Sequence, residues 1–369
     1  MNAKIVIGLG FGDEGKGLTT DYLCQQSDKP IVIRFNGGQQ AGHTVLKDGV
    51  RHVHSNFGSG TLRGVPSYFT EHTSVYLNTM QVEYGALKDK GVNPELYVHP
   101  LTKLTTPYDV AWNRMTESKN RHGSCGLGVA ATMKRNWESP YKLYAVDLTY
   151  KKVFNQKLDS IAQYYRELLK TRTSEEHTLF YDLMVPEMVK FVQNMENPIF
   201  NVMDYGYLTS FEDLIFEGAQ GIMLDMEHGV FPNVTCSHTT SKNALEICQK
   251  FDIYAELFYI TRCYQTRHGN GWMSPTGDIE LINNEHETNV SNPWQGDFRI
   301  GELDYDLLNH ALAIDNVYSV NQSKTLVVTC LDQRPEFKFE YGKIDFPVDD
   351  TIESYSADGE QMKIFASLI

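Results

Sequence analysis

A glycine-rich segment close to the N-terminus contains two acidic side chains and a lysine. Its sequence, GFGDEGKG at residues 10–17, has the G-x-x-x-x-G-K spacing of a phosphate-binding loop and places Asp13 and Glu14 beside Lys16. Glycines let backbone N–H groups approach phosphate oxygens, and the start of a following helix adds positive potential. The Ser or Thr that usually follows this lysine and binds magnesium is Gly17 here. Asp13 is therefore a candidate to hold a metal ion or to move a proton.

Two further glycine turns offer side chains for a polar ligand. NGGQQAGHT contains two amides and His43, and it follows the apolar run PIVIRF. FEGAQG follows another apolar run and ends near Gln220, whose amide offers both a donor and an acceptor for a base edge. A lone histidine is usually a solvated or core residue, but its place in a glycine turn after a strand favours a functional role for His43.

Hydroxyl and carboxylate groups follow later in the chain. PNVTCSHTTSKNA contains several hydroxyls, including that of Thr235, which suit phosphate or ribose contacts. Asp332 follows the strand-like run TLVV and could accept hydrogen bonds from guanine N1 and N2. Each of these segments is also compatible with an ordinary surface loop.

The elements around these turns indicate an α/β fold. KIVIGL, LTTDYLCQQ and PIVIRF read as strand, helix and strand, which predicts a βαβ unit. Apolar residues at helical spacing predict amphipathic helices over residues 158–195. We expect a large mixed, mostly parallel central sheet flanked by helices, with a P-loop-like first βα turn. Ligands of open parallel sheets bind at the carboxyl ends of the strands, so the polar turns should converge there.

Bulk properties exclude several classes of function. The 369 residues have a formal net charge of −14 and a pI near 5.3, which disfavours nucleic acid as a partner. We find no apolar stretch long enough for a membrane span and no signal-peptide pattern, so we expect a cytoplasmic protein. The six cysteines form no C-x-x-C pair, and no Cys/His cluster has zinc spacing.

Taken together, these motifs resemble those of the adenylosuccinate synthetase family. GFGDEGKG is similar to the family's W-G-D-E-G-K-G, and NGGQQAGHT to G-G-x-N-A-G-H-T. FEGAQGIMLDMEHGVFPNVTCSHTT matches F-E-G-A-Q-G-x-x-L-D-x-x-x-G-x-x-P-x-V-T-S-S-N-T-T almost completely. HGSCGLG, TRHGNG and TCLD resemble G-T-T-G-R-G, T-R-V-G-x-G and T-K-L-D in family order. The resemblance implies one domain over residues 1–369, with a helical insertion around residues 155–200.

The resemblance also implies a reaction. The family condenses L-aspartate with the 6-oxo group of a purine nucleotide, normally IMP, using GTP and Mg²⁺. Phosphorylation of O6 converts a poor leaving group into a good one, which the aspartate amine then displaces. The family is dimeric, so a homodimer is expected.

Residue roles follow where the motifs match. Asp13 would take the N1 proton and ligate Mg²⁺ with the Gly42 carbonyl, Lys16 would hold the phosphoryl group, and His43 would act as general acid at the γ-phosphate. Residues expected to bind the nucleoside triphosphate are Gly12, Glu14, Gly15, Lys16, Gly17, Thr44 and Asp332. Those expected to contact the purine nucleotide are Gln40, Ser124, Cys125, Arg135, Gln220 and Thr235, with Arg135 reaching a neighbouring subunit. Those expected to bind aspartate are Arg299 and Arg267.

Departures from the family pattern leave alternatives open. Gln40 replaces asparagine, Cys125 replaces threonine, and Leu127 replaces arginine. The family's four-arginine loop is NVSNPWQGDFRIGELD here, with Arg299 alone. Some phage relatives of the family use GMP or dGMP, so that substrate, with ATP as donor, is an alternative to IMP and GTP. A nucleotide-binding regulator without ligase activity is a third interpretation, although it would not need Asp13, Lys16 and His43 together.

Overall fold

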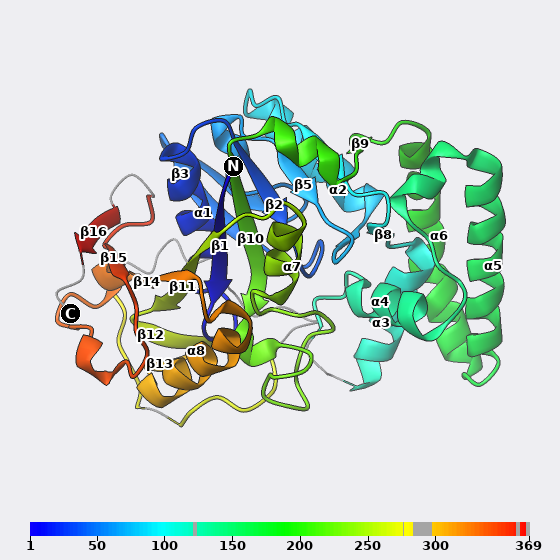
Figure 1. The fold of residues 1–369 in the computed structure, drawn as a ribbon. Coiled ribbons are helices and arrows are strands. Elements are labelled where there is room, and N and C mark those ends of the chain that lie inside the picture. Colours follow the sequence, from blue (N-terminus) through cyan, green and yellow to red (C-terminus); the bar gives the residue numbers. More distant parts are fainter. Residues whose placement is uncertain (121–123, 276, 283–296, 359–361, 367–369) are drawn as a thin grey trace.

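A ten-stranded sheet forms the centre of the computed structural model, which describes residues 1–120, 124–275, 277–282, 297–358 and 362–366. Its strand order is β16-β15-β14-β11-β1-β10-β2-β5-β7-β9 (Figure 1). Every neighbouring pair is parallel except β15 and β16, which are antiparallel. This is the mixed, mostly parallel sheet that the sequence predicts.

The first βαβ unit has the elements expected from the sequence. β1 (Asn2–Gly8) leads through the glycine loop into α1 (Lys16–Gln25), and β2 (Pro30–Arg34) follows. β1 and β2 do not pair directly, because β10 (Asp213–Gly221) lies between them. The central strands are buried on both faces and therefore read as continuous apolar runs.

Alternate side chains of each strand enter different cores. Ile5 and Ile7 pack with α7 (Lys242–Lys250) and α8 (Tyr305–Ser319) on one face of the sheet. Val6 packs with α1 on the other face. This period-two alternation holds the strands between two helical layers and fixes the sheet edge from which the loops emerge.

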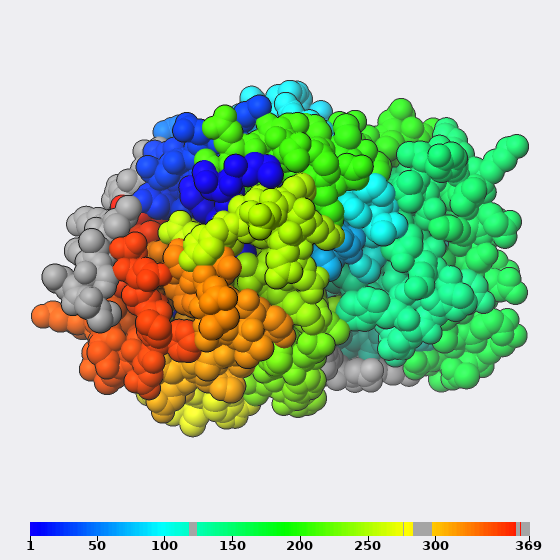
Figure 2. All heavy atoms as spheres, viewed as in Figure 1, coloured from blue at the N-terminus to red at the C-terminus, as the bar shows by residue number. Residues whose placement is uncertain are grey.

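A second hydrophobic core lies among the helices next to the sheet edge that β7 and β9 form. α5 (Lys151–Leu169) and α6 (Ser174–Glu196) are the two helices predicted around residues 158–195. They contribute Phe154, Phe180 and Phe191 to a cluster that also contains residues of α2 and α3. In Figure 2 these helices form the green end of the molecule, at the right of the view.

The remaining elements connect or extend these two parts. The other helices are α2 (Leu77–Asp89), α3 (Pro107–Asn120) and α4 (Val129–Glu138). The other strands of the large sheet are β5 (Ser67–Phe69), β7 (Leu96–Val98), β9 (Asn201–Val202), β11 (Ala255–Arg262), β14 (Ser323–Thr329), β15 (Asp350–Ser354) and β16 (Met362–Ala366). Two-stranded pairs are formed by β3 (His43–Lys47) with β4 (Val50–His54), β6 (Ser74–Val75) with β8 (Lys103–Leu104), and β12 (Tyr264–His268) with β13 (Phe298–Glu302).

Among the described residues, no helix has the length and apolar character that crossing a membrane requires.

Candidate active site

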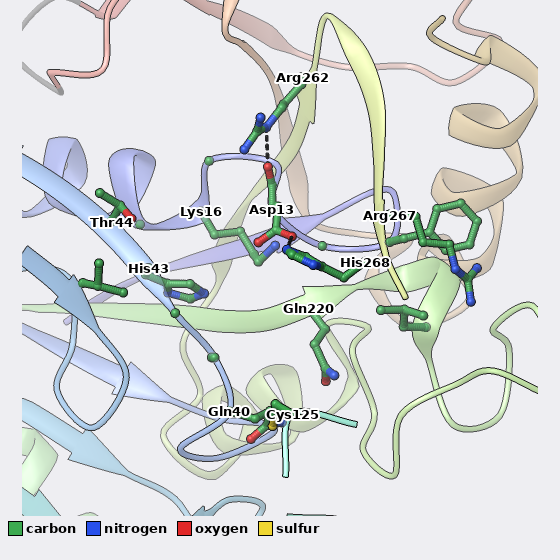
Figure 3. Close-up of a pocket in the computed structure, with 18 of the residues that line it drawn as sticks. Asp13, Lys16, Gln40, His43, Thr44, Cys125, Gln220, Arg262, Arg267 and His268 are labelled. Atoms are coloured by element: carbon green, nitrogen blue, oxygen red, sulfur yellow. Dashed lines mark hydrogen bonds and ion pairs between the residues drawn. The ribbon is translucent and has the colours of Figure 1, made fainter. Parts of the chain in front are cut away.

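A cavity of about 1290 Å³ opens where the carboxyl ends of the central strands meet (Figure 3). Its wall includes the loop after β1, residues 40–44 after β2, and the ends of β10 and β11. Single drug-sized ligands usually occupy about 300–1,000 Å³, so this cavity has room for more than one ligand. The convergence of polar turns predicted from the sequence is confirmed.

Two opposite charges of the glycine loop, those of Glu14 and Lys16, form an ion pair with each other. The Glu14 carboxylate contacts the Lys16 ammonium and accepts hydrogen bonds from the backbone N–H groups of Gly10 (3.1 Å) and Gly12 (2.7 Å). An added Cβ at Gly8 would lie 2.2 Å from Glu14 Oε2, so only glycine leaves space for this pair. Lys16 lines the cavity, whereas Glu14 lies behind the loop. Glu14 therefore shapes the loop and does not face the space where a triphosphate would bind.

Neighbouring strand ends hold the loop in place. Arg262, at the end of β11, donates through Nε to the Asp13 carbonyl (Figure 3). Thr266 Oγ1 donates to the Gly12 carbonyl at 2.9 Å, and Thr329 Oγ1 donates to the Glu14 carbonyl at 2.6 Å. Three strands distant in sequence thus fix the loop that carries Asp13.

Asp13 faces the cavity with a histidine beside it. His268 Nε2 lies 3.4 Å from Asp13 Oδ2 (Figure 3). Burial raises the pKa of Asp13, and the nearby His268, Arg262 and Lys16 oppose that rise. A carboxylate under such opposing influences is suited to accepting a proton from a ligand.

Three non-glycine residues around the cavity have left-handed backbone conformations. The φ angles are 62° at Asp13, 65° at Gln220 and 62° at Cys330. Each such conformation costs on the order of 1–3 kcal/mol and persists only where the surroundings enforce it. Their concentration around one cavity supports a functional site there.

His43, in the cavity wall, forms a close pair with the buried Glu217. His43 Nδ1 lies 2.6 Å from Glu217 Oε1, and Glu217 also accepts hydrogen bonds from the N–H and hydroxyl of Ser59. Burial alone would raise the pKa of Glu217, but His43, Arg34 and Ser59 together lower that pKa to about 2. The ionised Glu217 orients the imidazole and would stabilise its protonated form during a proton transfer.

Two glutamine amides in the wall have oxygens that a ligand could satisfy. Among the described residues, neither Gln40 Oε1 nor Gln220 Oε1 has a hydrogen-bond partner, although both atoms are buried. Both residues line the cavity. Buried polar atoms are normally hydrogen-bonded, so these oxygens are candidates to accept from a base or ribose.

Other predicted nucleotide contacts also lie in the cavity wall. Ser124 accepts a hydrogen bond from Asn113 Nδ2 at 3.0 Å, and burial raises the pKa of Cys125 to about 11, so its thiol is protonated. The remaining predicted residues found in the wall are Gly12, Gly15, Gly17, Gly42, Thr44, Thr235 and Asp332. Residues 122 and 123, which begin the HGSCGLG motif, lie outside the described residues.

The two predicted aspartate ligands have different positions. Arg267 lines the cavity, stacks 4.2 Å over the Phe11 ring, and donates to the carbonyls of Asn233 (2.9 Å) and Trp272 (2.7 Å). Burial, with a smaller effect of Arg299, lowers the pKa of Arg267 to about 10. Arg299 is not in the described cavity wall and donates to the carbonyls of Gly269 and Gly271, both at 2.8 Å. Most of the loop that replaces the four-arginine segment lies outside the described residues.

Arg135 requires a correction. Its side chain is completely buried, and Nε and Nη2 donate to the Asp109 carboxylate at 2.8 and 2.9 Å. Nη1 donates to the Tyr141 carbonyl at 2.7 Å, and Nη2 also donates to the Leu104 carbonyl. Because the guanidinium is buried and all three of its nitrogens donate to groups of this chain, it cannot reach the nucleotide of a neighbouring subunit. The predicted contact of Arg135 with a purine nucleotide is therefore not supported.

Three residues of the site received no role from sequence reasoning. Glu217 lies within the quoted FEGAQG turn and His268 within TRHGNG, where the family pattern has valine, but their partners lie far away in the sequence. Arg262 lies between these two motifs, at the end of β11. The departure from valine at His268 was the one available signal.

The sequence profile of adenylosuccinate synthetase matches residues 5–350. The chain belongs to the adenylosuccinate synthetase family. It is 28% identical to the enzyme of Borrelia turicatae over 347 residues, which cover 90% of this chain and 77% of that protein. It is 28% identical to the enzyme of Clostridium botulinum over 373 residues, which cover 94% and 83%. Membership makes the chain a C–N bond-forming ligase that acts on a purine nucleotide.

Two solved structures have the same fold. The fully ligated adenylosuccinate synthetase of Plasmodium falciparum superposes with a TM-score of 0.67 at 19% identity, covering 100% of this chain and 88% of that one. The succinoaminodeoxyadenylate synthetase of cyanophage S-2L, bound to dGMP and to dATP as an energy donor, gives 0.67 at 16% identity, covering 98% and 95%. At these identities the likeness establishes the fold.

Proposed function

We propose that this protein condenses L-aspartate with the 6-oxo group of a purine nucleoside monophosphate, normally IMP, through a 6-phosphoryl intermediate formed with GTP. One observation supports this most strongly: Asp13, Lys16 at the start of α1 and His43 at the start of β3 line the same cavity. Proton removal, phosphoryl positioning and proton donation are the three tasks that this phosphorylation needs.

In the first step, Asp13 accepts the purine N1 proton, and O6 becomes nucleophilic. O6 then attacks the γ-phosphorus, and the bond to the nucleoside diphosphate breaks. Lys16 stabilises charge on the transferring phosphoryl group, and His43, oriented by Glu217 at 2.6 Å, donates to the same group.

Mg²⁺ is the expected metal. The Asp13 carboxylate and the Gly42 carbonyl both belong to the cavity wall, and oxygen donors of this kind suit Mg²⁺. When bound, the ion would neutralise charge on the triphosphate.

In the second step, the aspartate amine attacks C6 and inorganic phosphate leaves. Arg267 is the cationic group that we assign to the aspartate side of the cavity. Arg299 supports the 269–271 segment that Arg267 also contacts, so we assign it an indirect role. This division differs from the direct contact expected from the sequence for both arginines.

The nucleotide pair has one specific alternative, GMP or dGMP with ATP. The phage enzyme of the same fold was solved with dGMP and dATP. The retained Asp13 favours IMP, but a carboxylate can also accept a hydrogen bond from a 2-amino group. Asp332, in the cavity wall, supports guanine in the energy donor.

Assembly and location are also proposals. We expect a homodimer, as in the family, and a cytoplasmic protein. All six cysteines are free thiols in the structure, which fits a reducing compartment.

A panel of nucleotides tests the reaction. The protein is incubated with GTP or ATP, Mg²⁺ and L-aspartate, with IMP, GMP or dGMP, and phosphate release is followed together with the mass of the product. We expect release that requires both aspartate and IMP, with GTP preferred. Asp13→Ala supplies the background.

The alternatives give different results in the same panel. Release with dGMP or GMP, but not with IMP, would establish the alternative substrate. If no combination exceeds the Asp13→Ala background, the ligase assignment fails and a nucleotide-binding regulator remains.

A further inference from the structure

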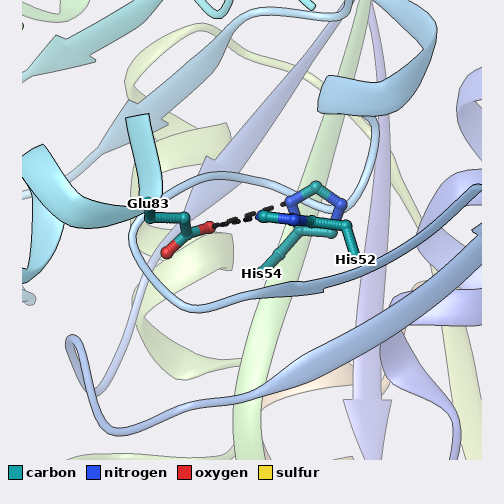
Figure 4. Close-up of side chains that lie close together, drawn as sticks. All are labelled: His52, His54 and Glu83. Atoms are coloured by element: carbon teal, nitrogen blue, oxygen red, sulfur yellow. Dashed lines mark ion pairs between the residues drawn. The ribbon is translucent and has the colours of Figure 1, made fainter. Parts of the chain in front are cut away.

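The buried face of the β3–β4 hairpin carries two histidines that point towards a glutamate of α2 (Figure 4). His52 and His54 alternate along β4 and leave it on the same side, where both are buried. His52 Nε2 lies 3.5 Å and His54 Nδ1 lies 3.9 Å from Glu83 Oε1. The two imidazole rings meet edge to face, with centroids 4.6 Å apart. Two imidazoles and a carboxylate therefore converge on one point.

The converging nitrogens have no hydrogen-bond partner among the described residues. This holds for His52 Nε2 and for both ring nitrogens of His54, whose side chain is fully buried. Buried polar atoms are rarely left unpaired, because each one loses the hydrogen bonds that it would make in water. An imidazole binds a metal ion through such an unpaired ring nitrogen.

The spacing matches a tetrahedral first-row metal. The three donor atoms all lie within 4.8 Å of one another. Zinc–ligand distances of about 2.0–2.2 Å place tetrahedral donors about 3.4 Å apart, so closing the site needs shifts on the order of 1 Å. We propose that His52, His54 and Glu83 bind one Zn²⁺-class ion, with water completing its coordination.

Neighbouring groups hold the carboxylate for this role. Glu83 Oε2 accepts hydrogen bonds from the backbone N–H of Asn56 (2.7 Å) and from its side-chain amide (2.9 Å). The Ser55 N–H donates to both oxygens at 3.1 Å. Such outer contacts orient a ligating carboxylate, and here Oε1 is the oxygen that faces the imidazoles.

Two cations near the site restrict the metals that can bind. Lys90 Nζ lies 2.8 Å from His52 Nδ1 and 2.7 Å from the Arg51 carbonyl, while the buried Arg34 interacts electrostatically with Glu83. When Nε2 binds a metal, Nδ1 carries a proton, so Lys90 must turn towards the Arg51 carbonyl. Only an ion with strong affinity for imidazole can bind against these charges, which favours Zn²⁺ and excludes Mg²⁺ and Ca²⁺.

The location gives the ion a positioning role. In the hairpin, His43 pairs in register with His54, and Val45 pairs with His52. A metal that joins β4 to α2 would therefore hold the strand that begins at His43. The inference concerns metal binding and does not depend on the proposed ligase reaction.

Metal binding to the complete protein tests this directly. The chain is stripped with chelator and titrated with Zn²⁺ by calorimetry, and metal content is measured after dialysis. We expect one Zn²⁺ per chain in the wild type, and binding at least roughly 100-fold weaker in His54→Phe and in Glu83→Gln. His99→Asn is the matched control, because His72, His99 and Glu71 form a half-buried group of the same composition with contacts of 3.8 and 3.9 Å.

Further readouts separate this site from the thiols and from misfolding. Co²⁺ in place of Zn²⁺ should give visible bands without a thiolate charge-transfer band. The melting temperature of the wild type, but not of Glu83→Gln, should rise with Zn²⁺. Equal stoichiometry and affinity in wild type, His54→Phe and Glu83→Gln, or a thiolate band, would overturn the proposal.

Lys90 provides a gain-of-binding test. Lys90→Met removes the ammonium that competes at His52 Nδ1, so Zn²⁺ affinity should rise by about tenfold. Weaker binding by this variant would contradict ligation through His52 Nε2.

Discussion

The buried face of one hairpin carries two histidine–glutamate groups with different geometry. His43 and Glu217 are 2.6 Å apart, and Glu217 has further donors in Ser59. His54 and Glu83 are 3.9 Å apart, and the His54 ring has no hydrogen-bond partner among the described residues. His43 and His54 are cross-strand partners, so their side chains leave the same face of the hairpin.

The difference shows that the distance between the histidine nitrogen and the glutamate oxygen decides whether such a pair suits proton transfer or metal binding. A direct hydrogen bond fixes an imidazole orientation and stabilises its protonated form, which suits proton transfer. A separation between 3.5 and 4 Å is too long for a hydrogen bond but matches two ligands of one metal ion. Arg34 interacts electrostatically with both glutamates and so belongs to both groups.

The largest expected effect is on kcat, which should fall much more when His43 is replaced than when His54 is replaced. His43→Asn should lower kcat by roughly 10²–10⁴-fold, because a proton donor is lost at the phosphoryl group. His54→Asn, assayed without Zn²⁺, should change kcat by less than about tenfold, since His54 is not in the described cavity wall. Steady-state rates of both variants measure the contrast, and equal losses would show that the two groups act as one.

Replacing each glutamate by glutamine compares the roles of the two carboxylates, and Glu217→Gln should have the larger effect. The neutral amide still fills the space but stabilises a protonated His43 less, so kcat should fall on the order of 10²-fold. Glu83→Gln, without Zn²⁺, is the matched control and should retain most of the activity. The two variants exchange the same atoms at two buried positions, so a larger loss in Glu83→Gln would contradict the assignment.

Acid stability gives a third contrast. The folded-state pKa of Glu217 is about 2, below its usual value of 4.5. Its contribution is therefore complete above pH 4.5 and is lost as the pH falls from 4.5 towards 2, a change of roughly 3 kcal/mol. Melting temperatures between pH 5 and pH 3 should fall less steeply in Glu217→Gln than in the wild type. Parallel curves would show that Glu217 is not ionised in the folded protein.

The smallest expected effect concerns aspartate. Arg299→Ala should raise the KM for aspartate only a few-fold, because Arg299 acts through the carbonyls of Gly269 and Gly271. Arg267→Ala should raise it by about tenfold or more, since this guanidinium lies in the cavity wall. Nucleotide affinity should stay unchanged in Arg299→Ala, and an unchanged aspartate KM there would remove Arg299 from the site altogether.

Local sequence patterns predicted the parts of the molecule that depend on neighbouring residues. The apolar runs of β1, β2, β10 and β14 and the glycine loop before α1 follow from period-two burial and turn chemistry. The cavity at the strand ends follows from the rule for parallel sheets.

Such local patterns could not predict contacts between residues that are far apart in the sequence. Glu217 lies 174 residues from His43, and the interaction between His268 and Asp13 depends on how β12 approaches the first loop. Arg135 was misassigned because the burial of its guanidinium depends on Asp109, 26 residues away. The alternation H-V-H in β4 placed His52 and His54 on one face, but nothing local indicated Glu83 as their partner.

Transfer of the purine 6-oxygen to phosphate tests the central claim most directly. The protein is incubated with IMP labelled with ¹⁸O at position 6, GTP, Mg²⁺ and L-aspartate, and the released phosphate is analysed by mass spectrometry. If O6 attacks the γ-phosphorus and leaves with it, each phosphate carries one ¹⁸O atom. Unlabelled phosphate released in step with the condensation product would contradict a 6-phosphoryl intermediate and, with it, the roles given to Asp13, Lys16 and His43.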